Sequence, residues 1–169
     1  MSNTVIIGID PGIAIVGYGV IEYSRNKFRT LAYGALTTPA HTPVEYRLSL
    51  IYNDMNLLLD KYKPDEMAIE ELFFNSNTTT AISVAEARGV ILLSAARKSV
   101  AVSEYTPLQV KQSVVGYGKA DKKQVILMVK TILGLDKVPK LDDTADALAI
   151  AICHAHSGAS RLKGFYNIV

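Results

Sequence analysis

The stretch Thr4-Val5-Ile6-Ile7-Gly8-Ile9-Asp10-Pro11-Gly12 decides the architecture of this chain. A short apolar run that closes on Asp-Pro-Gly is typical of a buried strand ending in a turn. Residues 12–23 and 27–37 follow, rich in β-branched and aromatic residues, with a polar turn at residues 24–26 between them. Because no helical pattern separates the three segments, we predict an antiparallel meander.

Helical and strand patterns alternate over the rest of the chain. Thr42-Pro43-Val44-Glu45 has the form of a capping box with proline at the first helical position, and Asp121 to Gln124 has a similar form. Helices are predicted from the capping box to residue 62 and at 78–98, 107–115, 121–133 and 142–156, and strands at 66–70 and 100–105. This order predicts an α/β protein of RNase H-like type, a mixed five-stranded sheet flanked by helices.

The length and composition fit one soluble domain. The 169 residues, 49% of them hydrophobic, suffice for a well-filled core, and we place the domain at 1–158 with a loosely held C-terminal tail at 159–169. The apolar helices are interrupted by charges, and the N-terminus lacks a signal-peptide pattern, so we expect neither a membrane span nor export. Cys153 is the only cysteine, which favours a reducing cytoplasm, and its apolar surroundings predict a core residue.

Basic residues gather in one segment, although the formal net charge is only +2. Between residues 97 and 130 there are seven of them, opposed only by Glu104 and Asp121. The seven are Arg97, Lys98, Lys111, Lys119, Lys122, Lys123 and Lys130. Such a segment suits a polyanion such as nucleic acid, and ordinary solvated helix faces are the alternative.

Four acidic residues fall where catalytic carboxylates are expected. Asp10 ends the first strand, Glu70 ends the strand at 66–70, and Asp143 and Asp146 lie three apart at the start of the last helix. Carboxylates among apolar residues need a compensating cation, and no lysine or arginine is near them in sequence. Oxygen-only ligands favour Mg²⁺, with Mn²⁺ as a substitute, and such a cluster would hold two ions for phosphodiester hydrolysis.

Each carboxylate also has a structural alternative. Asp10 before Pro-Gly could be a turn residue, Asp143 a helix cap and Glu70 an exposed strand end. For each residue alone, the structural alternative is more likely than catalysis. If the first and fourth strands are neighbours, however, the structural alternatives explain poorly why all four carboxylates occur together. Asp142 is assigned to a helix cap, and Glu71 to the outward neighbour of Glu70.

Several segments, in order, resemble the RuvC family of Holliday-junction resolvases over almost the whole chain. The resemblance is carried by Gly8-Ile9-Asp10-Pro11-Gly12 with Gly17-Tyr18-Gly19, Ala68 to Phe73, Glu86 to Val90, Gln109 to Ala120, and Asp143 to Ala151. It implies a homodimer that nicks two opposed strands of a four-way DNA junction beside a branch-migration motor.

The resemblance also implies roles for individual residues. Asp10, Glu70, Asp143 and Asp146 correspond to the family's metal-binding catalytic carboxylates. Lys111 and Lys122 correspond to DNA-contacting positions near the scissile phosphate, and Phe73 corresponds to an aromatic that stacks on or wedges between junction bases. The sequence itself agrees, since Phe73 and Phe74 open a polar loop beyond a predicted catalytic strand, and Lys119 joins the expected phosphate contacts.

Three other functions remain as rivals. ATPases of the sugar-kinase, actin and Hsp70 group begin with a similar strand and turn, but they need two such domains. An RNase H-like nuclease for structured RNA would share the fold and the carboxylates. A non-catalytic nucleic-acid scaffold would need none of the four carboxylates.

Overall fold

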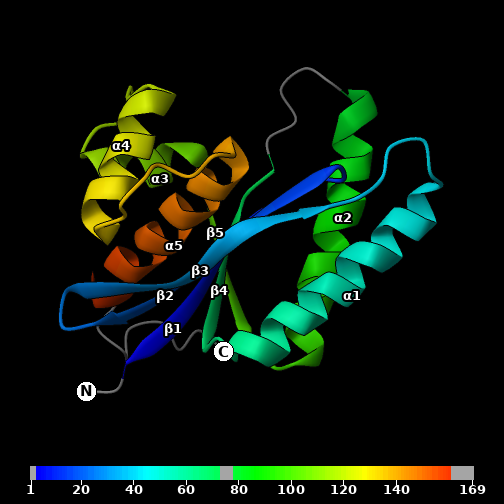
Figure 1. Ribbon diagram of the computed structural model, residues 1–169, viewed down its shortest axis with the longest axis horizontal. Coiled ribbons are helices and arrows are strands. Elements are labelled where there is room, and N and C mark those ends of the chain that lie inside the picture. The colour runs from blue at the N-terminus through cyan, green and yellow to red at the C-terminus, as the bar shows by residue number, and fades with distance from the viewer. Residues whose placement is uncertain (1–2, 73–77, 161–169) are drawn as a thin grey trace, which may run out of the picture.

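Helices cover both faces of one central sheet (Figure 1). The structure, a computed structural model, describes residues 3–72 and 78–160. Helices α3, α4 and α5 lie on one side of the sheet, and α1 and α2 lie on the other. In chain order the elements are β1 (Thr4–Asp10), β2 (Ile15–Ser24), β3 (Lys27–Thr37), α1 (Val44–Tyr62), β4 (Glu66–Glu70), α2 (Thr78–Arg97), β5 (Ala101–Tyr105), α3 (Pro107–Val115), α4 (Lys122–Leu133) and α5 (Asp142–Ser160).

The sheet has the strand order β3-β2-β1-β4-β5. Strands β1, β2 and β3 pair antiparallel, while β4 pairs parallel to β1 and β5 parallel to β4. These pairings confirm the predicted meander and the mixed five-stranded RNase H-like sheet. They also confirm that β1 and β4 are adjacent strands. The hairpin turn at Arg25 and Asn26 has φ angles of 50° and 60°, as expected for a two-residue turn that matches the twist of its strands.

Alternation along β1 explains the two-sided core. Ile6 packs on the α5 side of the sheet with Leu148, whereas Ile7 and Ile9 pack on the other side with α1 and α2. Because side chains alternate, Asp10 falls on the same face as Ile6, the face that α5 covers. Cys153 is buried on this α5 side, as predicted.

The structure corrects several element ends. Helix α1 begins at Val44 after Pro43, which has no side-chain cap; the Thr42 hydroxyl donates instead to the Pro39 carbonyl, so the predicted capping box there is wrong. The box formed by Asp121 and Gln124 is confirmed, with the Asp121 carboxylate accepting from the Gln124 amide. Strand β2 starts at residue 15 rather than 12, since bends at residues 13 and 14 follow β1, and α5 runs on to residue 160 rather than 156.

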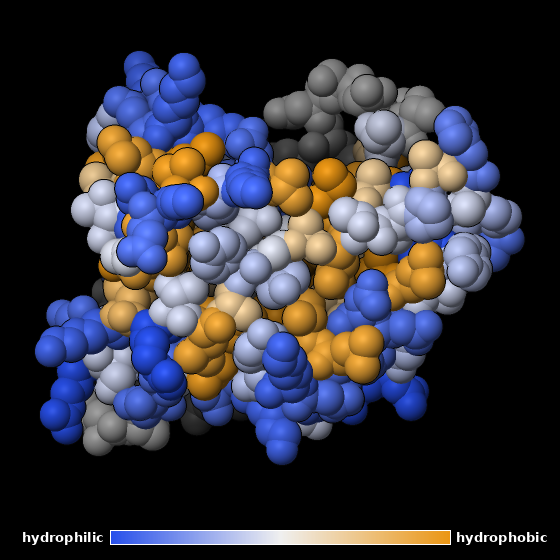
Figure 2. All heavy atoms as spheres, in the orientation of Figure 1, coloured by the Kyte–Doolittle hydropathy of each residue, from blue (hydrophilic) through white to orange (hydrophobic). Residues whose placement is uncertain are grey.

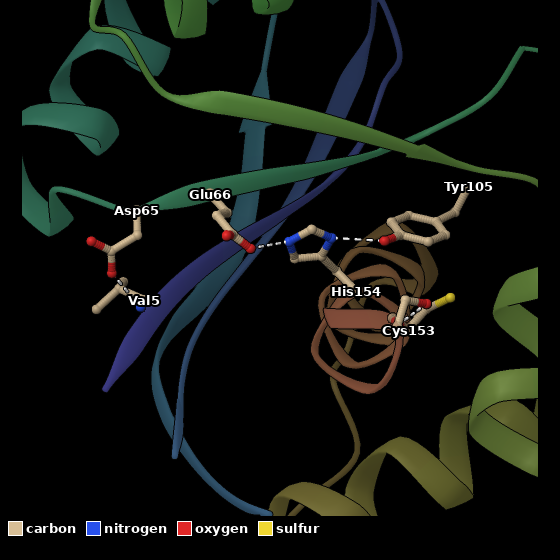
Figure 3. Close-up of polar contacts among 7 residues, drawn as sticks. Val5, Asp65, Glu66, Tyr105, Cys153 and His154 are labelled. Atoms are coloured by element: carbon tan, nitrogen blue, oxygen red, sulfur yellow. Dashed lines mark hydrogen bonds and ion pairs between the residues drawn. The ribbon is translucent and has the colours of Figure 1, made fainter. Parts of the chain in front are cut away.

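A buried histidine connects α5 to two strands (Figure 3). His154 lies between the carboxylate of Glu66, at 2.5 Å from Nε2, and the hydroxyl of Tyr105, at 2.8 Å from Nδ1. Glu66 begins β4 and Tyr105 ends β5. Buried polar groups need hydrogen-bond partners, and this network supplies them for His154 while it ties the C-terminal half of α5 to β4 and β5.

The outer surface shown in Figure 2 mixes hydrophilic side chains with apolar ones over α1 and α4. Leu57 on α1 and Leu127 on α4 are among the exposed apolar residues. Apolar residues scattered in this way are normal on a globular surface. No helix within residues 3–72 and 78–160 is both long and apolar enough to cross a membrane.

Candidate metal-binding active site

Strand register brings Asp10 and Glu70 together. The parallel pairing of β1 with β4 matches Ile9 with Ile69, so the next residue on each strand is an acid. Both side chains point to the α5 side, because Glu70 shares the face of Ala68 and Asp10 that of Ile6. The two carboxyl groups share a hydrogen bond. The sequence-predicted pair is thus adjacent at the carboxyl ends of two central strands.

Glycines let α5 approach the sheet at this same edge. Asp10 pairs across the sheet with Gly17, and a Cβ on Gly17 would lie only 2.1 Å from the main-chain oxygen of Asp143. A Cβ on Gly8 would similarly lie 2.1 Å from the main-chain oxygen of Ala147. The first turn of α5 therefore rests directly on bare backbone beside Asp10. This close contact brings Asp143 and Asp146 to the strand-end pair.

Electrostatics show that the four carboxylates act on one another. The pKa of Asp10 is raised to about 8, first by burial and then by the negative charges of Glu70, Asp146 and Asp143. Burial, followed by the charge of Asp146, also raises the pKa of Glu70. Burial raises the pKa of Asp146, although Lys122 opposes the shift. Without a bound cation the raised pKa of Asp10 favours the protonated carboxyl, which donates its hydrogen bond to Glu70, whereas a divalent cation would favour the charged form.

A lysine distant in sequence supplies part of the missing positive charge. Lys122, at the start of α4, places Nζ 3.2 Å from a carboxylate oxygen of Asp146 and 3.3 Å from one of Asp142. No lysine or arginine is near these carboxylates in sequence, but α4 folds over the start of α5 and brings Lys122 to them. Asp142 is also not the expected cap: it is the first residue of α5, and its carboxylate faces Lys122.

The donor set fits a hard divalent cation in its chemistry. It offers carboxylate oxygens alone, and the single ammonium group of Lys122 brings one positive charge to four carboxyl groups. In the part of the chain that the structure describes, no three His, Cys, Asp or Glu side chains already stand close enough together to hold a metal ion. The ligand roles of the four acids remain predictions.

Of the predicted nucleic-acid-binding residues, two lie beside the carboxylates. Lys111 on α3 and Lys122 on α4 line one hollow together with Glu70 and Asp146. Lys119 lies exposed between α3 and α4. Phe73 lies outside the described residues, so its role stays a prediction. Glu71 is exposed, as expected for the outward neighbour of Glu70.

Arg88 is a supporting residue that sequence reasoning missed. From α2 its Nε donates to the main-chain carbonyl of Glu70 at 3.4 Å, and its Nη2 lies 2.7 Å from a carboxylate oxygen of Glu104 on β5. The guanidinium therefore links the end of β4 to β5 beneath the site. In the sequence Arg88 lies within an apolar helix and within the segment Glu86 to Val90 that carries the resemblance, but neither fact reveals a partner in another element.

The family model and the most similar curated relatives bear one name. The family model described as Crossover junction endodeoxyribonuclease RuvC matches residues 6–154. A protein of that name from Clostridioides difficile (strain 630) is 61% identical over 153 residues, covering 90% of this chain and 90% of the relative. Another, from Alkaliphilus oremlandii (strain OhILAs), is 59% identical over 154 residues, covering 91% and 94%.

Solved structures agree with these sequence matches. The structure of T. thermophilus RuvC in complex with Holliday junction substrate superposes with a TM-score of 0.89 at 38% identity. The match covers 93% of this chain and 96% of that one.

Proposed function

Since the chain belongs to the RuvC family of crossover junction endodeoxyribonucleases, we propose that it resolves four-way DNA junctions by paired symmetric nicks during recombination and repair. The observation that carries the proposal is the mutually interacting set of carboxylates at the sheet edge, with two lysines beside it. The T. thermophilus relative that shares this fold is described as bound to a Holliday junction substrate.

We propose that the reaction depends on Mg²⁺, with Mn²⁺ as a substitute, and that Asp10, Glu70, Asp143 and Asp146 hold two ions. When bound, such ions supply an activated water and charge stabilisation at the leaving oxygen. The protein's own part is to hold the carboxylates. Strands β1 and β4 fix two of them, and the glycine-backed start of α5 fixes the others.

Lysines position the DNA backbone in this proposal. Lys111 and Lys122 stand beside Glu70 and Asp146, so they suit the phosphates next to the cut. Lys122 would exchange its contact with Asp146 for a phosphate once cations neutralise the carboxylates. Lys119 adds a more distant backbone contact, and Phe73 is proposed to stack on bases at the junction.

The exposed side of α2 supports the proposed homodimer. Residues 82, 86, 89, 93 and 96 form one exposed stripe, while Ala87, Ile91 and Ala95 face the core. Ile82 and Leu93 are exposed by 64% and 52%, and a Cβ on Gly89 would meet no atom within 4 Å. Ile82, Leu93 and Ala96 give this stripe apolar members that face outward, where a second copy could bind and bring a symmetric second site.

The remaining expectations extend the same proposal. The RuvC resemblance implies a branch-migration motor as a partner, and the single buried Cys153 suits a reducing cytoplasm. We propose one domain at residues 1–158 and a tail at 159–169, with α5 running two residues past that boundary to Ser160.

The test is cleavage of a labelled, partly mobile synthetic four-way junction by the wild type and by Asp10→Asn. Asparagine keeps the shape of the side chain and removes its charge. We expect paired nicks with Mg²⁺ from the wild type, and binding without nicks from the variant. Asp136→Asn, an exposed position between α4 and α5, is the matched control and should cleave normally. A wild type that binds junctions but does not nick them, even with Mn²⁺, would favour the non-catalytic scaffold.

A further inference from the structure

Tyr105 lies where two supports of the candidate site meet. It ends β5, and in the parallel register of β4 and β5 it stands directly beside Glu70. Its main-chain carbonyl accepts a hydrogen bond from the amide of Glu71 at 2.9 Å. The next residue, Thr106, caps α3, the helix that carries Lys111. A displacement of the backbone at Tyr105 would therefore move both the end of β4 and the start of α3.

The Tyr105 side chain is held by α5 (Figure 3). Only 5% of the residue is exposed, and its hydroxyl lies 2.8 Å from Nδ1 of His154. The two rings meet edge to face, with their centroids 5.7 Å apart. Through Nε2, His154 also contacts the carboxylate of Glu66. Because Glu66 begins the strand that ends at Glu70, these contacts connect both ends of β4 by way of α5.

The direction of these hydrogen bonds follows from the chemistry of their groups. An ionised carboxylate can only accept, so Nε2 of His154 carries the proton that lies toward Glu66. In the neutral imidazole Nδ1 is then an acceptor, and the Tyr105 hydroxyl donates to it. Each bond therefore has one donor and one acceptor, which holds the tyrosine ring at a defined angle.

An apolar pair could fill this part of the core without any polar group. Burial of a hydroxyl and an imidazole costs desolvation, which their hydrogen bonds offset. The hydrogen bonds add direction, since they weaken when their partners shift or rotate, whereas apolar side chains can slide and stay in contact. Accurate placement is therefore what this polar pair contributes beyond burial.

We propose that Tyr105 and His154 are positioning residues that hold Glu70 in place for metal binding, an inference that rests on the proposed metal-dependent cleavage. The hydrogen bond between them fixes the end of β5, and the Tyr105 carbonyl holds the Glu71 amide and with it the backbone of Glu70. Because His154 belongs to α5, the same hydrogen bond ties β5 to the helix that carries the other two acids on the site's helical side.

The test removes a single oxygen atom. Tyr105→Phe keeps the ring and deletes the hydroxyl, and His154→Leu breaks the same hydrogen bond from its other partner. Tyr23→Phe is the matched control, because the Tyr23 hydroxyl also makes a 2.8 Å hydrogen bond, to Asn26 in the β2–β3 turn. Ile51→Val, in the core on the α1 side of the sheet, controls for a loss of stability alone. Thermal melting compares the stability of all four variants first.

The main readouts are Mn²⁺ binding without DNA and single-turnover cleavage at saturating protein. We expect Tyr105→Phe and His154→Leu to bind Mn²⁺ about tenfold more weakly and to cleave about tenfold more slowly than wild type, with unchanged metal-free junction binding. The double variant should lose no more than His154→Leu alone, since both substitutions break one bond. Losses that multiply, no loss in Tyr105→Phe, or an equal loss of Mn²⁺ binding in Ile51→Val would overturn the inference.

A metal-free readout separates this inference from the proposed function. Relative to core amides of the same protein, the Glu71 amide should exchange its hydrogen about tenfold faster in Tyr105→Phe than in wild type, as followed by NMR. Tyr23→Phe should exchange as wild type does. Equal exchange in the two variants would overturn the positioning role even if cleavage is normal. A wild type that neither binds Mn²⁺ nor cleaves junctions would overturn the proposed function, and with it the role of this pair in metal binding.

Discussion

Replacing Gly17 with alanine would add one carbon at the contact that positions α5. That carbon would lie 2.1 Å from the main-chain oxygen of Asp143, while ordinary contact starts at 3.4 Å, so strand and helix must separate by about 1 Å. The helix would carry Asp143 and Asp146 away from Asp10 by a similar amount. Misplacing reacting groups by about 1 Å can lower a rate about 100-fold, and the added carbon costs about 1–3 kcal/mol of stability.

The assay is single-turnover junction cleavage with Mg²⁺, beside metal-free junction binding and thermal melting. We expect Gly17→Ala to melt at a lower temperature, to bind the junction normally and to cleave about 100-fold more slowly. Gly158→Ala is the matched control, because it lies near the other end of α5 with no atom within 4 Å of its added carbon. If Gly17→Ala folds and cleaves as fast as Gly158→Ala, close docking of α5 does not position the carboxylates.

Four further outcomes are expected. Metal-free wild type should lose stability as pH rises from about 4 to 8, by up to about 1.4 kcal/mol per pH unit, because the folded-state pKa of Asp10 is raised to about 8 above its ordinary 3.8. Asp10→Asn should flatten this loss in melting experiments, and equal slopes would contradict the raised pKa. Arg88→Ala should slow cleavage about tenfold with little change in junction binding, since it frees the end of β4; unchanged cleavage would deny its positioning role. Leu93→Glu should sediment as a monomer and lose paired nicking, and a variant that stays dimeric would exclude this face of α2. Lys122→Ala should reduce the slope of log affinity against log salt by about 1, whereas an unchanged slope would show that Lys122 contacts no phosphate.

Local patterns predicted the fold and the position of the acids. Two carboxylates could be placed on neighbouring strands from the apolar run before Asp10, the meander that follows it and the short strand before Glu70. The parallel register of β1 and β4 confirms that these strands are adjacent. Strand ends and helix starts follow from turn and capping chemistry, which acts over a few residues. Where that chemistry misled, at Pro43, the helix simply begins without a side-chain cap.

Contacts between distant segments could not be predicted in the same way. Lys122 reaches Asp146 only because α4 packs over the start of α5, and Arg88 reaches Glu70 only because α2 packs behind β4 and β5. The hydrogen bond between Tyr105 and His154 likewise depends on α5 packing against β5, and neither residue reveals the other in the sequence. Such features follow from tertiary packing and not from local pattern.

The most direct measurement of the central claim is Mn²⁺ binding to the protein, followed by electron paramagnetic resonance. If the four carboxylates form one metal centre, the wild type should bind about two Mn²⁺ per protomer at saturation. Asp10→Asn and Asp146→Asn should lose most of this binding, and Asp136→Asn should retain it. No Mn²⁺ binding by the wild type, or equal binding by all four proteins, would contradict a metal centre built from these carboxylates.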